Sequence, residues 1–104
     1  MSSERFATLI QVNQENELFR FSYGEALFDE GKFEDCLSHL EFCVGKKSDW
    51  MIPQILLGKA MIALNRKEEA IPFLEKALQL ARDQNHEDPE AEVEGLLDDI
   101  RLTP

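Results

Sequence analysis

The chain has no sustained two-residue alternation of apolar and polar side chains, and it has no Asn-Gly or Asp-Gly turn. Both are sequence signals of β-hairpins, so their absence argues against a β-sheet protein. Long apolar runs are also missing, which excludes a membrane-spanning helix of about 20 residues. The segment 1–15 lacks the apolar core of a secretory signal, and we expect none there.

Positive charge is scarce, because 11 Lys and Arg residues stand against 21 Asp and Glu residues and give a net charge of −10. Proteins bind phosphate backbones mainly through Lys and Arg, and anionic membranes also repel an acidic chain. We therefore expect neither nucleic acid nor membrane as a partner. The region after Asp83 is the most acidic, and we interpret it as a solvated helix face, with a docking surface for a basic partner as the alternative.

Cysteine is rare, and Cys36 and Cys43 are the two that occur. Without a secretory signal they predict reduced thiols and a cytoplasmic location. Together with His39 they have a spacing that places all three on one helix face, as metal ligands would lie. One helix supplies only three ligands, whereas a structural zinc site takes four. We expect no metal, and we interpret both cysteines as small packing residues.

The usual enzyme motifs are absent as well. There is no Gly-rich phosphate loop, no Cys-x-x-Cys, no His-Glu-x-x-His and no Gly-x-Ser-x-Gly. Neighbouring carboxylates such as Asp98 and Asp99 diverge on a helix, so they are not a catalytic pair. We therefore expect neither enzyme activity nor a cofactor.

What the sequence does contain is an internal repeat around two glycines, Gly24 and Gly58. The size and polarity of the surrounding side chains repeat more closely than their identity. The repeated pairs are Tyr23/Leu57, Ala26/Ala60, Leu27/Met61, Cys36/Ala70, Leu40/Leu74 and Cys43/Ala77. The period, about 34 residues, is typical of stacked supersecondary units. Because a mid-helix glycine costs about 1 kcal/mol relative to alanine, two at equivalent places indicate close approach of a partner helix.

Apolar residues at helical spacing predict about six helices. The first is expected before a polar break at 13–16, and the others at about 17–29, 33–44, 50–64, 67–82 and 88–101. Ser3 is the expected cap of the first helix, and Ser48 or Asp49 that of the fourth. The last helix carries one apolar stripe, formed by Val93, Leu96, Leu97 and Ile100.

Glycines and prolines predict where these helices end and begin. Gly31 can take the left-handed conformation that ends a helix, Asn65 is its counterpart in the second repeat, and Gly45 is expected to close the third helix. Pro53 falls in the first turn of the fourth helix, where a missing N–H costs little. Pro72 lies one turn into the fifth helix and need not break it.

This pattern resembles the tetratricopeptide repeat family, in which a helix pair recurs with a period of about 34 residues. The residues that carry the resemblance are Tyr23-Gly24, Leu57-Gly58, Cys36, Ala70, Leu40, Leu74, Cys43 and Ala77. The second repeat lacks the tryptophan that often opens the first helix, and both repeats lack the usual closing proline. The resemblance implies one all-α domain over 1–104, a helical-hairpin solenoid or α-α superhelix. Its parts are half a repeat at 1–15, repeats at 17–50 and 51–84, and a capping helix at 88–101.

The resemblance also implies that the first helices of successive repeats line a concave groove. The groove residues are then Leu18, Phe21, Glu25, Phe28, Asp29, Ile52, Ile55, Lys59, Ile62 and Ala63. Such a groove suits an amphipathic helix or an extended apolar segment, with its few charged side chains setting orientation. One use of the family, a clamp for the carboxylate tail of heat-shock chaperones, needs basic residues where this chain has Glu25 and Asp29.

Three hypotheses of function follow. The first is a module that binds a protein or peptide partner in the groove. The second is a structural homo-oligomer, such as a homodimer, that buries the same surface against a second copy, and the N-terminal helix is a further candidate to cover it. The third is an enzyme or metal protein that uses Cys36 and His39. The sequence does not name the partner.

Overall fold

The computed structural model describes residues 3–102, and its regular structure is helical. The helices are α1 (Ser3–Val12), α2 (Glu17–Asp29), α3 (Phe33–Lys46), α4 (Met51–Ala63), α5 (Lys67–Asp83) and α6 (Glu87–Leu102). Residues 3–102 contain no β-strand, which confirms the all-α prediction. The outermost residues of the predicted domain, 1–2 and 103–104, lie outside the described residues.

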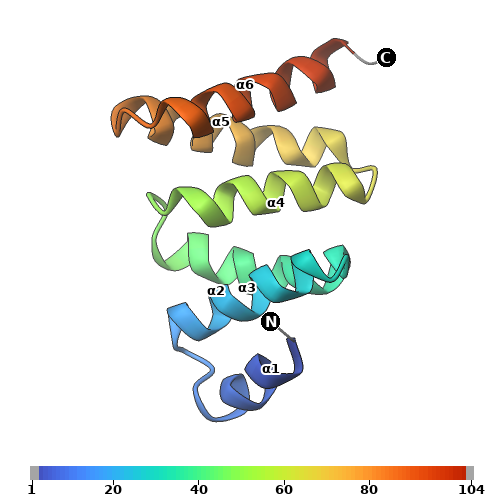
Figure 1. Cartoon of the computed structure of the whole chain (residues 1–104), viewed down its shortest axis with the longest axis vertical. Helices are drawn as coiled ribbons and strands as arrows, with labels where there is room; N and C mark the ends of the chain where they lie inside the picture. Colours follow the sequence, from blue (N-terminus) through green and yellow to red (C-terminus); the bar gives the residue numbers. More distant parts are fainter. Residues whose placement is uncertain (1–2, 103–104) are drawn as a thin grey trace.

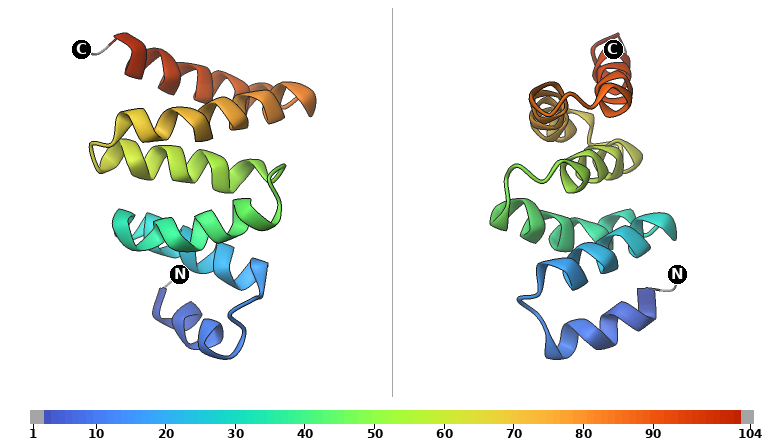
Figure 2. Two further views of the ribbon diagram at one scale, coloured as in Figure 1. Left: turned by 180° about the vertical axis from the view of Figure 1, so that it is seen from behind. Right: turned by 60° about the vertical axis from the view of Figure 1, so that its left-hand side comes forward.

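The helices are stacked in chain order along the long axis of the molecule (Figure 1). Other views keep this order, with α1 at one end and α6 at the other (Figure 2). Each helix packs mainly against its neighbours in sequence, and α2 also touches α4. The most extensive contacts join α2 to α3 and α4 to α5. These two pairs are the helical hairpins that the repeat predicts.

The two repeated glycines lie where the helices of each hairpin come closest. A β-carbon added at Gly24 would lie 3.0 Å from Cγ of Leu40, and one added at Gly58 would lie 2.6 Å from Cγ of Leu74. Both leucines are fully buried. The predicted close approach at these glycines is confirmed, and a side chain at Gly58 would overlap its neighbour more severely.

Helices α2, α4 and α5 end in the same left-handed turn. The residues in this conformation are Gly31, Asn65 and Asn85, with φ of 78°, 61° and 58°. In each turn the next N–H donates to a carbonyl five residues earlier: Lys32 to Leu27, Arg66 to Met61 and His86 to Ala81. This hydrogen bond satisfies a carbonyl that the helix end would otherwise leave unpaired. The predictions for Gly31 and Asn65 are confirmed.

The predicted ends of α3 and α4 are wrong. Gly45 does not close α3, which continues to Lys46. The residue before α4 is Trp50 rather than Ser48 or Asp49, and no side chain caps this helix. A physical reason lies in Pro53, the third helical residue, which lacks one of the N–H groups that a capping side chain normally binds.

Ser3, predicted to cap α1, is instead a residue of that helix, and it links α1 to the end of α2. Its backbone N–H donates to Glu30 Oε2 at 2.7 Å, and its hydroxyl donates to Glu30 Oε1 at 3.0 Å. The Ser3 N–H, and then Lys32, hold the pKa of the Glu30 carboxyl below its ordinary value. This polar contact joins the start of α1 to the end of α2, and it was not predicted from the sequence.

The core extends from α2 to α6, and most of it is aliphatic. The largest of the fully buried side chains are those of four leucines, Leu40, Leu57, Leu74 and Leu97. The predicted stripe of α6 is confirmed, since Val93 and Leu97 are buried and Leu96 and Ile100 pack against the core. Pro72 lies inside α5, which stays continuous. Among the described helices, none is both long enough and apolar enough to cross a membrane.

Candidate functional site

The residues predicted to line a groove differ in their exposure. Leu18, Glu25, Asp29, Ile52 and Ala63 are exposed, Phe21, Phe28, Lys59 and Ile62 are half-buried, and Ile55 is buried. Leu18 and Ile52 are large apolar side chains that remain 66% and 43% exposed. They occupy equivalent places, each being the second residue of its helix, α2 or α4.

The two phenylalanines of this set pack on other aromatic rings of the chain. The ring of Phe21 lies 4.9 Å from that of Trp50, and the ring of Phe28 lies 5.3 Å from that of Phe33 in an edge-on arrangement. Aromatic pairs of this geometry stabilise a fold beyond the area they bury. The phenylalanines therefore support the first hairpin and its junction with α4, and they offer less surface to a partner than Ile52 does.

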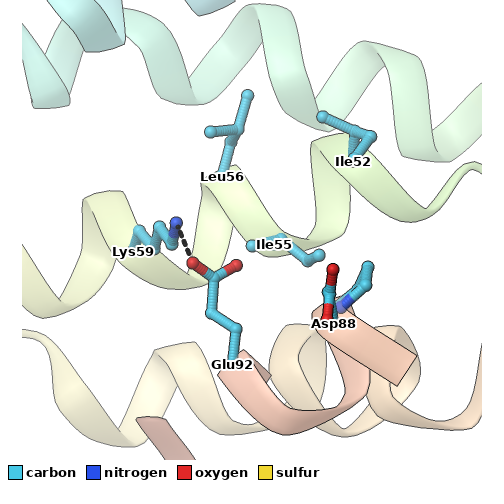
Figure 3. Close-up of a pocket in the computed structure, with 7 residues that line it drawn as sticks. Ile52, Ile55, Leu56, Lys59, Asp88 and Glu92 are labelled. Carbon is cyan, nitrogen blue, oxygen red and sulfur yellow. Dashed lines mark hydrogen bonds and ion pairs between the residues drawn. The ribbon is translucent and has the colours of Figure 1, made fainter. Parts of the chain in front are cut away.

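A hollow of about 300 Å³ lies between α4 and α6 (Figure 3). Its lining residues are Ile52, Ile55, Leu56, Lys59, Asp88, Pro89 and Glu92. In the close-up, Asp88 and Glu92 point from α6 toward α4, with Ile55 between the two helices. The structure thus brings together three of the predicted groove residues, from α4, with residues of α6 that the sequence analysis did not assign to the groove. We call this hollow and its lining the α4–α6 groove.

The charged residues of the α4–α6 groove are one cation and two carboxylates. Lys59 Nζ lies 2.9 Å from Glu92 Oε2, and this pair joins the two walls. Asp88 is exposed, and no cationic group of residues 3–102 lies within 4.0 Å of it. Exposed ion pairs contribute little to stability. The position of α6 therefore depends more on its buried Val93 and Leu97 than on Lys59 and Glu92.

The α6 wall of the groove was not predicted because the last helix, expected at 88–101, was interpreted as a cap. Helix α6 begins two positions later than a strict continuation of the repeat from α4 would place it. The residues of α4 and α6 that correspond are Pro53 and Pro89, Leu57 and Val93, and Met61 and Leu97. Helix α5 has 17 residues where α3 has 14, and the loop that follows is one position shorter, which accounts for the shift. The repeated proline at the third residue of α4 and α6 is the sequence signal that could have revealed this.

Helix α1 lies beside the part of α2 that was predicted to line the groove. A smaller hollow of about 120 Å³ is lined by Phe6 of α1 together with Ser22, Glu25, Ala26 and Asp29 of α2. The face of α2 that carries Glu25 and Asp29 therefore has Phe6 beside it. The more open apolar surface is the one between α4 and α6.

The sulfur and imidazole groups of α3 are engaged within the fold. Cys36 and Cys43 are fully buried, and burial raises the pKa of each thiol to about 11. His39 accepts a hydrogen bond at Nδ1 from Arg20 Nε at 3.0 Å. Among the described residues, no group of three potential ligands is placed to hold a metal ion. The two thiols are mostly protonated near neutral pH, which agrees with their interpretation as packing residues.

Comparison of the chain with protein-family models, with curated proteins and with solved structures finds no match. The resemblance to tetratricopeptide repeats therefore depends on the residues that carry it. The case for a function depends on the geometry of the α4–α6 groove.

Proposed function

We propose that this protein is a tetratricopeptide-type binding module that holds an apolar segment of a protein partner in the α4–α6 groove. The observation that carries this proposal is the exposed side chain of Ile52 at the edge of a hollow whose far wall is another helix. Exposed apolar surface beside polar groups often marks an interaction site. In both hairpins a glycine of the first helix packs closely against a leucine of the second, and the two glycines are one repeat period apart. This repetition supports the proposal that the module is of the tetratricopeptide type.

The proposed mechanism is burial of the partner's apolar side chains against Ile52, Leu56 and Pro89. Each fully buried side chain of leucine size contributes about 1.5–3 kcal/mol. Two or three of them contribute at most about 9 kcal/mol and must also offset a loss of translational and rotational freedom of at least about 4 kcal/mol, so we expect weak binding with a Kd well above about 1 μM. Lys59 and Glu92 border the apolar surface, where polar groups orient a bound segment more than they tighten it.

The second candidate is a homo-oligomer that buries this surface against another copy. Its support is that Val12 and Leu18, on either side of the α1–α2 loop, are also exposed. A net charge of −10 on each copy opposes it, because two such chains repel one another. Binding of a different protein is therefore the function we put first.

Site-directed crosslinking tests the proposal and separates the two candidates. The variants Ile52→Cys and Leu102→Cys each receive a thiol-linked benzophenone, since the buried native thiols react slowly at their raised pKa. Leu102 is a matched control because it is exposed but lies outside the groove. Both labelled proteins are irradiated in extract of the native cells, and the adducts are identified by mass spectrometry.

We expect a protein adduct from position 52 that is absent from position 102. An adduct that joins two copies of this chain from position 52 would favour the homo-oligomer, and light scattering at several concentrations would check it. Identical adducts from both positions, or none from position 52, would contradict the proposed function.

A further inference from the structure

We infer that the segment held in the α4–α6 groove is a cationic amphipathic helix, with apolar side chains along one face and Lys or Arg beside them. This inference rests on the proposed function, and it specifies the shape and charge of the occupant.

The shape follows from the arrangement of the apolar lining. Ile52, Ile55 and Leu56 stand at positions i, i+3 and i+4 of α4, so their side chains lie near one edge of that helix. Pro89 adds an apolar contact from α6, the opposite wall. A groove between two helices accepts a third helix whose own i, i+3 and i+4 side chains enter it, which is a recurrent mode of peptide recognition.

The charge follows from the ionic groups of the lining. Lys59 is engaged by Glu92 at 2.9 Å, whereas Asp88 has no ion-pair partner among the residues that the structure describes. One cation against two carboxylates leaves the lining with a net charge of −1. An incoming ammonium or guanidinium group therefore finds an unpaired carboxylate, but an incoming carboxylate finds no unpaired cation.

Neighbouring helices extend this preference beyond the groove. Glu25 and Asp29 on α2 and Glu87 on α6 are exposed, and within residues 3–102 none forms an ion pair. The whole chain carries a charge of −10, which attracts a cationic segment over distances up to about 10 Å at 0.1 M salt. The same field disfavours a second copy of this acidic chain as the occupant.

Two designed peptides of about 15 residues are the probes, a length at which an amphipathic helix can form on binding. Both carry leucines at i, i+3, i+4 and i+7, and the flanking positions are lysine in one peptide and glutamate in the other. Fluorescence anisotropy of the labelled peptides measures the Kd for the chain of residues 1–104 at low and at high salt. We expect the lysine peptide to bind at least about tenfold more tightly at low salt, and the difference to narrow as salt rises.

Three variants locate the binding. Ile52→Asn removes an apolar contact and should weaken the lysine peptide about tenfold. Asp88→Asn with Glu92→Gln removes both carboxylates of the groove, so binding of the lysine peptide should weaken. Binding of the glutamate peptide should strengthen, because Lys59 loses its ion-pair partner Glu92. The control, Glu41→Gln with Asp98→Asn, changes the net charge equally at exposed residues outside the groove and should leave the preference intact.

The outcomes separate the inference from the function on which it rests. Equal binding of both peptides, lost in Ile52→Asn, would keep the groove as a binding site and overturn its preference for cations. If the double substitution in the groove and the control double substitution weaken binding of the lysine peptide equally, the peptide is attracted to the whole acidic surface. That result would also overturn the inference. If neither peptide binds the wild type, both the inference and the proposed groove fail.

Discussion

The hairpins α2–α3 and α4–α5 are built on the same positions but carry different surfaces. In each, a glycine of the first helix faces a buried leucine of the second, Gly24 with Leu40 and Gly58 with Leu74. In each, the first helix ends in a left-handed residue with the same backbone hydrogen bond. The residues between these fixed positions are where the hairpins diverge.

In α2–α3 the variable positions form a polar and aromatic cluster. Arg20 donates to His39, and its guanidinium lies 4.3 Å from the ring centre of Phe42. Their counterparts in the second repeat are Gln54, Phe73 and Lys76. Gln54 is buried and donates to the carbonyl of Ser48, and Phe73 packs against the core. The frame thus needs only small and large residues at a few places, so the two hairpins can differ in the charge and polarity of their other residues.

The largest effect is expected when the close approach at Gly58 is broken. Gly58→Leu would force Leu74 away and lower the free energy of unfolding by about 1–3 kcal/mol through overpacking. Gly24→Leu should lower the free energy of unfolding by less. A β-carbon added at Gly24 would lie 3.0 Å from Cγ of Leu40, whereas one added at Gly58 would lie 2.6 Å from Cγ of Leu74. Urea denaturation of both variants measures the difference. Unchanged stability in Gly58→Leu would contradict the packing, and equal losses would remove the distinction between the hairpins.

A smaller effect is expected at the left-handed turns. Gly31 has no atom within 4 Å of an added β-carbon, so Gly31→Ala tests the backbone conformation alone and should cost about 1 kcal/mol. Asn65→Gly gives the second hairpin the residue of the first, and it should change stability by less than about 0.5 kcal/mol, since asparagine already tolerates this conformation. Both values come from urea midpoints. A loss in Asn65→Gly as large as in Gly31→Ala would show that the turns are not equivalent.

The smallest effect is a loss of stability through histidine titration, which is expected of the first hairpin because α4–α5 contains no histidine. Burial, and then the charge of Arg20, lower the pKa of His39 below its ordinary 6.5, while Asp35 opposes this. The unfolded chain therefore binds a proton more readily, so stability is fully present above pH 6.5 and falls as the pH drops below it. His39→Phe, which copies Phe73, should remove this part of the slope.

Urea denaturation between about pH 7 and pH 5 compares His39→Phe with the wild type, because this range spans the ordinary histidine titration. The exposed His86 supplies the matched control as His86→Gln. A slope that persists unchanged in His39→Phe would assign the pH dependence to other groups.

The sequence predicted the frame well because the frame depends on local chemistry. The two glycines, the turn at Gly31 and the break that ends with Asn16 act through backbone conformation and helix spacing, which a single chain displays directly. Asn16 directly precedes α2 and caps it, since its side chain accepts a hydrogen bond from the N–H of Phe19 at 3.0 Å. These residues need no knowledge of distant parts of the fold.

The groove was predicted less completely because it depends on residues far apart in sequence. Asp88 and Glu92 of α6 line the hollow together with residues of α4, and the whole of α5 separates the two helices along the chain. The role of Phe21 depends on Trp50, which directly precedes α4 and whose ring it packs against. A fixed repeat period cannot show either relationship.

The linear stack also has a consequence for how quickly the chain folds. Because each helix packs mainly on its neighbours in sequence, most native contacts close only short loops. Chains of such low contact order typically fold in microseconds to milliseconds. The hairpins α2–α3 and α4–α5, which have the most extensive contacts, are expected to form first. Helix α1, which is tied to the end of α2 through Ser3 and Glu30, is expected to join last and to open first.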